Sequence, residues 1–331
     1  MLVQSNFTDI VSTTWMHDAD LGRGFLLLSS STNAGRVWRW ERGGGPIPIK
    51  KSLFLEKSGC RSKKNCQIGS GAIAIDFREK ETSLEGTLLV AEWGENRVVR
   101  LEVSGARTPL LMEVPDVCHA NKKNRINQPT SMVMTPFGDL IVVDHSPECD
   151  KSVIWRLERA MQVQPLASSW ESRMAHKWTK VHHDHSIAML LMRERIGGIA
   201  LDALWEGLYA IVKDNDDDKV QLVSVPILLD NEEGKSQQET QNLLDLSEFS
   251  ATPGPLVMDK NKHLYVGVDD GVLIVSSAPH KILGHLQLPE RPVSLTIGDD
   301  GFLYISSTAN LYRVRVKNGP MTVPTNLLKT R

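Results

Sequence analysis

The sequence predicts an all-β protein, a six-bladed β-propeller that the whole chain, residues 1–331, forms as a single domain. Two observations support this prediction. A hairpin pattern of an apolar run, a polar turn and an alternating run occurs six times, and a short strand pattern precedes every copy. No long helical period competes with these repeats. Self-similar units of roughly 40 to 50 residues are typical of propeller blades, which are small antiparallel sheets around a central channel.

The hairpin is clearest in residues 86–102, GTLLVAEWGENRVVRLE. Gly94 and Asn96 mark a turn there between two runs that favour β-strands. The other five hairpins begin at Gly24, Gly138, Gly207, His263 and Gly301. Each hairpin, together with the strand before it, is expected to form most of one blade.

The strand before each hairpin ends in a turn residue. These strands end at Asp18, Asp76, Thr135, Asp202, Asp259 and Asp299, so the unit recurs after 58, 59, 67, 57 and 40 residues. The uneven steps indicate connections of different length. Loop insertions are expected near residues 159–195 and 229–243, the second of them strongly polar. The ring is expected to close by pairing residues 1–9 with the last blade near residues 321–328, which would protect open strand edges.

Composition excludes some classes of partner. The net charge is −2, so no basic surface points to nucleic acid. No apolar stretch reaches the ~18 residues of a membrane span. The first residues, MLVQSNFTDIVSTTWMHD, show no signal-peptide pattern. The composition fits a soluble protein and indicates no particular compartment.

Four cysteines are present, Cys60, Cys66, Cys118 and Cys149. Cys60 and Cys66 bracket a short polar segment, GCRSKKNC. They are expected to be bridged if the protein is secreted, and two free thiols are the alternative. Their spacing does not supply the four ligands of a structural zinc site.

Two segments resemble one known family. LLVAEWGENRVVRLE and the later NRINQPTSMVMTPFGDLIVVD are similar to segments of the senescence marker protein / gluconolactonase / luciferin-regenerating enzyme family. Residues 125–131, RINQPTS, stand where that family has a segment like Arg-Leu-Asn-Ser-Pro-Asn-Asp. The resemblance implies a six-bladed propeller and a divalent metal, usually calcium, at the floor of its channel. It also implies hydrolysis of lactones or related esters, with the metal polarising the carbonyl.

The family's metal ligands are a Glu, two Asn and an Asp. Aligned by hand, these four positions fall on Val11, Thr130, Gly197 and Gly254. Valine and glycine side chains cannot ligate calcium, and a threonine hydroxyl is a weak neutral ligand. No metal or other cofactor is therefore expected at the family's calcium site, and calcium is expected only if this register is wrong.

The ends of the innermost strands should surround the mouth of the channel. The residues expected to bind a ligand there are Trp15, Asn127, Thr130, Ser131, Asp144 and His145. Trp15 and Asn127 match a Trp and an Asn of the family. His145 follows a strand and could serve as a base. Turn and loop roles are the structural alternatives for Asn127 and His145.

Three functions remain open. The first is a gluconolactonase-like hydrolase of lactones or related esters with a degenerate metal site. The second is a non-catalytic propeller that binds a small molecule or a protein at its channel face. The third is a metal-free enzyme, similar to the relatives of strictosidine synthase. The fold alone does not choose among them. Three or more carboxylate or amide oxygens converging on the channel floor would favour an enzyme, and an apolar or glycine-lined floor would favour binding.

Overall fold

A computed structural model gives the fold. It describes residues 2–4, 7, 9–18, 20, 22–32, 35–41, 52–56, 69–76, 86–101, 106–119, 123–158, 187–202, 207–214, 218–227, 240–317 and 319–320. In these residues β-strands are the regular elements, apart from one short 3-10 helix, η1 (Trp93–Glu95). None of the described helical segments has the length and apolar character needed to cross a bilayer.

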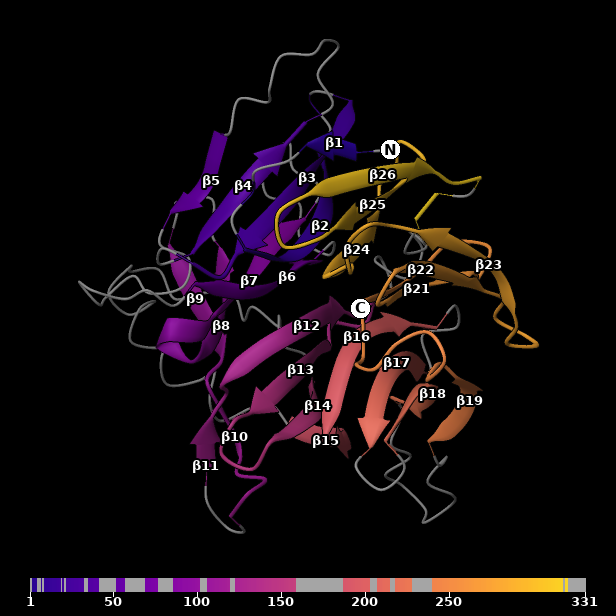
Figure 1. Ribbon diagram of the computed structural model, residues 1–331. Helices are drawn as coiled ribbons and strands as arrows, with labels where there is room; N and C mark the ends of the chain where they lie inside the picture. Colours follow the sequence, from indigo (N-terminus) through magenta and orange to yellow (C-terminus); the bar gives the residue numbers. More distant parts are fainter. Residues whose placement is uncertain are drawn as a thin grey trace.

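Six antiparallel sheets of four strands surround a central axis, as Figure 1 shows. The first blade consists of β2 (Ile10–Asp18), β3 (Arg23–Ser30), β4 (Arg36–Trp40) and β5 (Ser52–Glu56). The second consists of β6 (Ser70–Asp76), β7 (Thr87–Glu92), β8 (Arg97–Leu101) and β9 (Arg107–Leu111). The third consists of β12 (Gln128–Met134), β13 (Leu140–Ser146), β14 (Lys151–Leu157) and β15 (Ile187–Arg193). The fourth consists of β16 (Arg195–Leu201), β17 (Gly207–Asp214), β18 (Lys219–Pro226) and β19 (Gln241–Asp245). The fifth consists of β20 (Leu256–Met258), β21 (Leu264–Val268), β22 (Gly271–Val275) and β23 (Ile282–Gln287). The sixth is β24 (Ser294–Ile297), β25 (Phe302–Ser306), β26 (Leu311–Arg315) and β1 (Leu2–Gln4). The predicted six-bladed propeller is confirmed.

The ring closes through the N-terminal strand. β1 pairs antiparallel with β26, with Leu2 opposite Tyr312 and Gln4 opposite Leu311. The prediction placed the N-terminal residues in the last blade correctly, but it named the wrong partner segment. β26 is the third strand of that blade and offers the free edge, whereas residues 321–328 lie outside the described residues. An outer strand taken from the other end of the chain covers an edge that would otherwise stay open.

The two predicted insertions contain blade strands. β15 lies within the expected insertion at 159–195, and β19 begins within the one at 229–243. Both are the outermost strands of their blades. The sequence of β15, IAMLLMR, is an apolar run, although Met189 and Met192 are exposed in the structure. The strand signal is therefore present in the sequence, within the predicted insertion. A short two-stranded sheet, β10 (Glu113–Pro115) with β11 (Lys123–Arg125), connects the second blade to the third.

The hydrophobic core lies between neighbouring blades. Its buried residues form six clusters, each made from two adjacent blades. Strand β7 shows why the inner runs are continuously apolar. Its Leu88 and Val90 pack toward the first blade, whereas Leu89 and Ala91 pack toward the third. A sheet covered on both faces buries successive side chains, so such strands read as unbroken apolar runs.

A fully buried carboxylate of the second blade, that of Glu92, joins three strands. Glu92, with no exposed side-chain surface, ends β7 and accepts hydrogen bonds from two arginines. Arg97 Nε lies 2.5 Å from one of its oxygens, and Arg107 Nη1 lies 2.6 Å from the other. These arginines begin β8 and β9, so one carboxylate joins three neighbouring strands. A buried charge must be paired in this way, because leaving it alone in the interior is costly.

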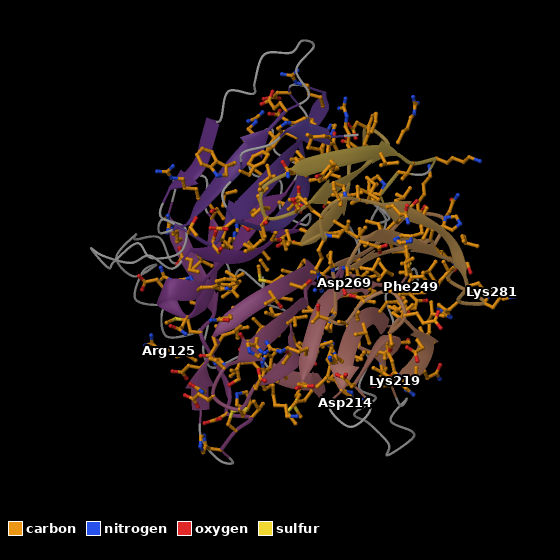
Figure 2. The ribbon with its side chains drawn as sticks, viewed as in Figure 1. Arg125, Asp214, Lys219, Phe249, Asp269 and Lys281 are labelled. Atoms are coloured by element: carbon orange, nitrogen blue, oxygen red, sulfur yellow. A yellow bond between two sulfur atoms is a disulfide. The ribbon has the colours of Figure 1, made fainter. Side chains whose placement is uncertain are left out.

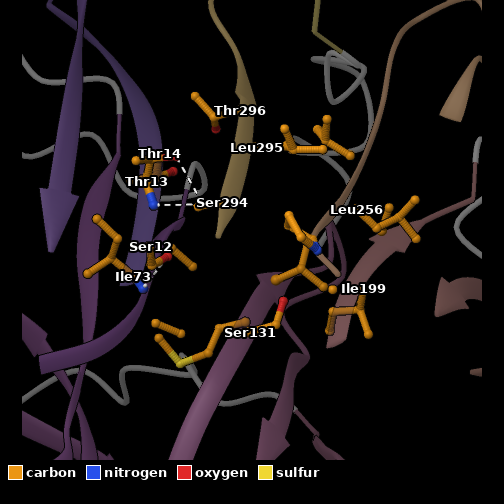
Figure 3. A pocket seen from close by; sticks show the side chains of 18 of the residues that line it. Ser12, Thr13, Thr14, Ile73, Ser131, Ile199, Leu256, Ser294, Leu295 and Thr296 are labelled. Atoms are coloured by element: carbon orange, nitrogen blue, oxygen red, sulfur yellow. Dashed lines mark hydrogen bonds between the residues drawn. The ribbon is translucent and has the colours of Figure 1, made fainter. Parts of the chain in front are cut away.

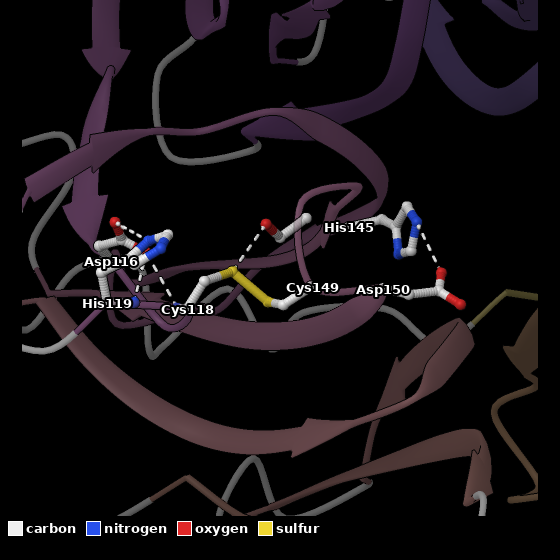
Figure 4. Close-up of a disulfide and its surroundings, with 7 residues drawn as sticks. Asp116, Cys118, His119, His145, Cys149 and Asp150 are labelled. Atoms are coloured by element: carbon white, nitrogen blue, oxygen red, sulfur yellow. Dashed lines mark hydrogen bonds and ion pairs between the residues drawn. A yellow bond between two sulfur atoms is a disulfide. The ribbon is translucent and has the colours of Figure 1, made fainter.

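A disulfide links Cys118 to Cys149, with 5.8 Å between their Cα atoms (Figure 4). Cys118 lies between β10 and β11, and Cys149 lies in the turn between β13 and β14. The bond therefore fastens the connecting segment to the third blade. The expected pair Cys60 and Cys66 lies outside the described residues.

Changing Glu92 to Ala should lower the free energy of unfolding by about 3–5 kcal/mol, because two buried guanidinium groups lose their counter-charge. Urea denaturation measures this loss. The matched control is Arg23→Ala, which removes an exposed ion pair with Glu41 and should cost less than about 1 kcal/mol. Equal losses for the two variants would show that the buried cluster adds nothing special to the stability.

Candidate functional site

A cavity of about 1040 Å³ lies on the propeller axis. All six inner strands contribute to it, namely β2, β6, β12, β16, β20 and β24, and Figure 3 shows part of its lining. Small-molecule sites in proteins usually have roughly 300–1,000 Å³. The cavity is therefore large enough for a small-molecule ligand.

The cavity walls are mainly aliphatic. Apolar side chains come from every inner strand and include Val11, Ile73, Met132, Ile199, Leu256 and Leu295. The polar side chains are mostly hydroxyls, those of Ser12, Thr13, Thr14, Thr130, Ser131, Ser294, Thr296 and Thr308. Among the described lining residues, Asp299 is the one carboxylate. This floor is apolar rather than a ring of oxygen ligands.

Side-chain hydroxyl groups accept backbone hydrogen bonds at two seams, the contacts of the first blade with the sixth and with the second. Each inner strand is the edge of its sheet, so half of its backbone polar groups have no partner strand. Thr13 N–H donates to Ser294 Oγ of the sixth blade at 2.9 Å, and Ile73 N–H donates to Ser12 Oγ of the first blade at 3.2 Å (Figure 3). These serines therefore complete the wall of the channel, and one acceptor site of each is already used.

At the seam between the fourth and fifth blades, the backbones of glycine residues are in contact. Gly198 N–H donates to the carbonyl oxygen of Gly254 at 2.7 Å, which brings the two backbones into direct contact. A Cβ atom on Gly254 would overlap the carbonyl group of Gly267, and one on Gly197 would overlap that of Gly254. Side chains are thus excluded at these two positions by the close approach of the backbones.

The four positions aligned with the family's metal ligands all line the cavity. They are Val11, Thr130, Gly197 and Gly254. Together they offer one hydroxyl, one aliphatic side chain and two glycines without side chains. Calcium takes six to eight oxygen ligands, with carboxylates among them, so this donor set does not fit it. Elsewhere in the described part of the chain, Asp116, His119 and Glu148 gather beside the disulfide, outside the cavity lining (Figure 4 labels the first two).

Three of the six expected ligand-binding residues line the cavity. Trp15, Thr130 and Ser131 do so, and Trp15 also stacks on Tyr304 of the sixth blade with 5.3 Å between the ring centroids. All three residues lie on inner strands, along the axis.

Asn127 and Asp144 lie instead beside a separate crevice of only about 10 Å³. The buried Asp144 carboxylate accepts the N–H groups of Asn127 at 3.0 Å and Gln128 at 2.7 Å. Burial raises the pKa of Asp144 to about 7, although its backbone hydrogen bonds act in the opposite direction. The expectation that these two residues reach the channel is therefore corrected: Asp144 fixes the start of β12.

His145 is also absent from the described cavity lining. Its Nδ1 lies 3.2 Å from Ser152 Oγ, and Arg195 Nη1 lies 3.2 Å from its Nε2 (Figure 4 shows its ion pair with Asp150). Burial lowers the pKa of His145, and the charge of Arg195 lowers it further while Asp150 opposes them. Both ring nitrogens are thus engaged, Nδ1 within the third blade and Nε2 with Arg195 of the fourth blade.

One pair of cavity residues was not expected from the sequence. His17 is the last residue but one of β2 in the first blade, and Asp299 lies two residues after β24 in the sixth. His17 Nδ1 lies 2.5 Å from Asp299 Oδ2, and both residues line the cavity. The two are 282 residues apart, so only the closed ring shows that they meet.

No protein-family model and no curated protein matches the sequence. Solved structures do match it. A gluconolactonase from Xanthomonas campestris, XC5397, is 15% identical, with a TM-score of 0.64 over 95% of this chain and 88% of that chain. Regucalcin from Agrobacterium tumefaciens, a calcium-binding protein, is 10% identical, with a TM-score of 0.54 over 96% of this chain and 97% of that chain.

PorZ, a surface component of the type-IX secretion system of Porphyromonas gingivalis, is also similar. It is 17% identical, with a TM-score of 0.54, and the match covers 93% of this chain and 39% of PorZ. At such low identities the likenesses show the fold alone. The chain has a six-bladed propeller fold of the kind found in gluconolactonase and regucalcin, which confirms the predicted resemblance at the level of the fold.

Changing Gly254 to Ala should destabilise the protein by about 1–3 kcal/mol, the usual cost of forcing an extra group into a packed interior. Chemical denaturation followed by circular dichroism measures this. Gly319→Ala is the control, because a Cβ there meets no described atom within 4 Å, and it should change the stability by less than about 0.5 kcal/mol. If Gly254→Ala left the stability unchanged, the seam would have room for a side chain.

Proposed function

We propose that this protein binds one small, mainly aliphatic molecule in its central cavity and does so without calcium. The observation that carries the proposal is the cavity wall, to which every inner strand contributes aliphatic side chains. Burying apolar surface contributes roughly 0.8 kcal/mol for each CH₂ group removed from water. An aliphatic ligand therefore gains affinity along the whole length of this wall.

Hydrolysis of a polar sugar lactone, as the name of the Xanthomonas campestris relative suggests, is less well supported. A sugar ring carries several hydroxyl groups, and burying them without hydrogen-bond partners costs free energy. The wall offers few side chains for that purpose, since Ser12 and Ser294 already bond to the backbone. The positions aligned with the calcium ligands offer no carboxylate.

Two of the other lining hydroxyls are well placed for a polar group of the ligand. In Figure 3 the hydroxyl groups of Ser131 and Thr296 are directed toward the cavity. A few polar groups on an otherwise apolar wall fix the orientation of a ligand. The expected ligand is thus an aliphatic molecule with one carbonyl, ester or hydroxyl group.

A fluorescent probe tests this proposal. The neutral, apolar N-phenyl-1-naphthylamine should bind at a single site, with enhanced emission. Ser131→Phe, which fills the cavity, should weaken binding by about tenfold or more, about 1.4 kcal/mol. Met189→Phe on the exposed outer strand β15 is the control and should leave binding unchanged. Absence of probe binding by the wild-type protein, or equal binding by all three proteins, would contradict the proposal.

Calcium should not stabilise the protein through the cavity. A ligand that binds only the native state raises the melting temperature by mass action. We therefore expect the same melting temperature in excess EDTA and in millimolar calcium, measured by calorimetry. A calcium-dependent increase that Thr130→Ala removes would show that the alignment of ligand positions is wrong and would restore the metal-dependent hydrolase.

A further inference from the structure

The His17–Asp299 pair differs from the hydroxyl groups of the cavity, because it can exchange a proton. His17 and Asp299 are about one-third exposed, with side-chain accessibilities of 32% and 37%. Both therefore reach the solvent in the cavity and are not sealed inside a seam. Asp299 Oδ2 lies beside Nδ1, so a neutral imidazole that donates Nδ1–H to this carboxylate presents the lone pair of Nε2. None of the described residues hydrogen-bonds to Nε2.

A second histidine–aspartate pair shows what a structural pair looks like in this fold. His263 Nδ1 lies 3.1 Å from Asp259 Oδ2, and the His263 side chain is 34% exposed, much like that of His17. Asp259, however, is fully buried and accepts the N–H groups of Asn261 and His263, so it builds the local turn. Neither His263 nor Asp259 lines the cavity. The His17–Asp299 pair instead joins two distant segments at the cavity wall.

Backbone donors lie on the same strand as His17. Thr13 N–H points away from β3, toward Ser294. In an antiparallel ladder, alternate residues turn their polar groups to the same side, and the register of β2 with β3 is unbroken from Thr13 to Asp18. The N–H groups of Trp15 and His17 are therefore also on the free edge of β2. Such fixed donors can stabilise the negative charge that forms on a carbonyl oxygen under attack.

We propose that His17, oriented by Asp299, is the general base of a metal-free hydrolysis of esters or lactones with an aliphatic acyl group. This inference rests on the proposed function, since the cavity must first hold such a molecule. His17 Nε2 takes a proton from a water molecule, and the water oxygen forms a bond to the acyl carbon. The bond from that carbon to the alkoxy oxygen then breaks, and the alkoxide takes the proton from His17. The products are a carboxylic acid and an alcohol, and Asp299 remains a carboxylate throughout.

The test uses p-nitrophenyl hexanoate as substrate, in buffer that contains excess EDTA. The wild-type protein should release p-nitrophenolate faster than the buffer alone. His17→Gln should lower kcat/KM by about 100-fold, within the usual contribution of a general base. Added imidazole should restore part of the rate of that variant, whereas a merely structural loss would not be restored. Asp299→Asn should cause a smaller loss, because it leaves the base in place but less well oriented.

His263→Gln is the matched control and should keep the wild-type rate. Binding of N-phenyl-1-naphthylamine to each variant shows that the fold and the cavity are intact. Hydrolysis that is no faster than in buffer, or equally fast with His17→Gln, would overturn the inference while probe binding leaves the proposed function standing. Loss of probe binding in the wild-type protein would overturn the proposed function itself. A rate that EDTA abolishes and calcium restores would also overturn a metal-free mechanism.

Discussion

The free edges of the inner strands are the constraint on which the rest of the structure depends. Each inner strand has a partner on one side only, so its remaining backbone groups must find partners across a seam or meet solvent in the channel. The seams supply these partners in different ways. Serine hydroxyls accept backbone N–H groups at the two seams beside the first blade, and a direct backbone contact between Gly198 and Gly254 joins the fourth and fifth blades. The aliphatic clusters between the blades hold these contacts in place.

This constraint also decides the chemistry of the cavity. Gly197 and Gly254 occupy positions where the resembling family places metal ligands, yet the contact between the backbones leaves no space for a side chain there. The serines that could bind a ligand at the first seam are used by backbone groups. What remains along the axis is a mainly aliphatic wall with hydroxyls, Arg291 and one histidine–aspartate pair. The cavity therefore differs in kind from a calcium centre built of carboxylate and amide oxygens.

The sequence predicted the parts of the fold that carry local signals. Inner strands and hairpins have alternating or continuous apolar patterns and clear turns, so all six units were found. β19, QNLLD, was missed because this outer strand is short, mostly polar and largely exposed. β15, IAMLLMR, has an apolar run and was missed because it follows directly on a long insertion. The partner of β1 could not be found either, since pairing between chain ends leaves no local trace.

The candidate site was only partly predictable for similar reasons. Trp15, Thr130 and Ser131 lie on inner strands, so the repeat itself placed them on the axis. Asp144 and His145 lie on β13, the second strand of its blade, and their side chains hold backbone and neighbouring-blade groups. His17 and Asp299 meet across the seam that closes the ring, at a separation of 282 residues. No spacing rule within one repeat could have paired them.

Anomalous diffraction from crystals soaked with both calcium and a brominated aliphatic ester tests the central claim most directly. The account predicts a bromine peak among the aliphatic side chains of the inner strands and no calcium peak on the axis beside Thr130 and Gly254. An ordered calcium ion at those residues, with the ester absent from the cavity, would contradict it.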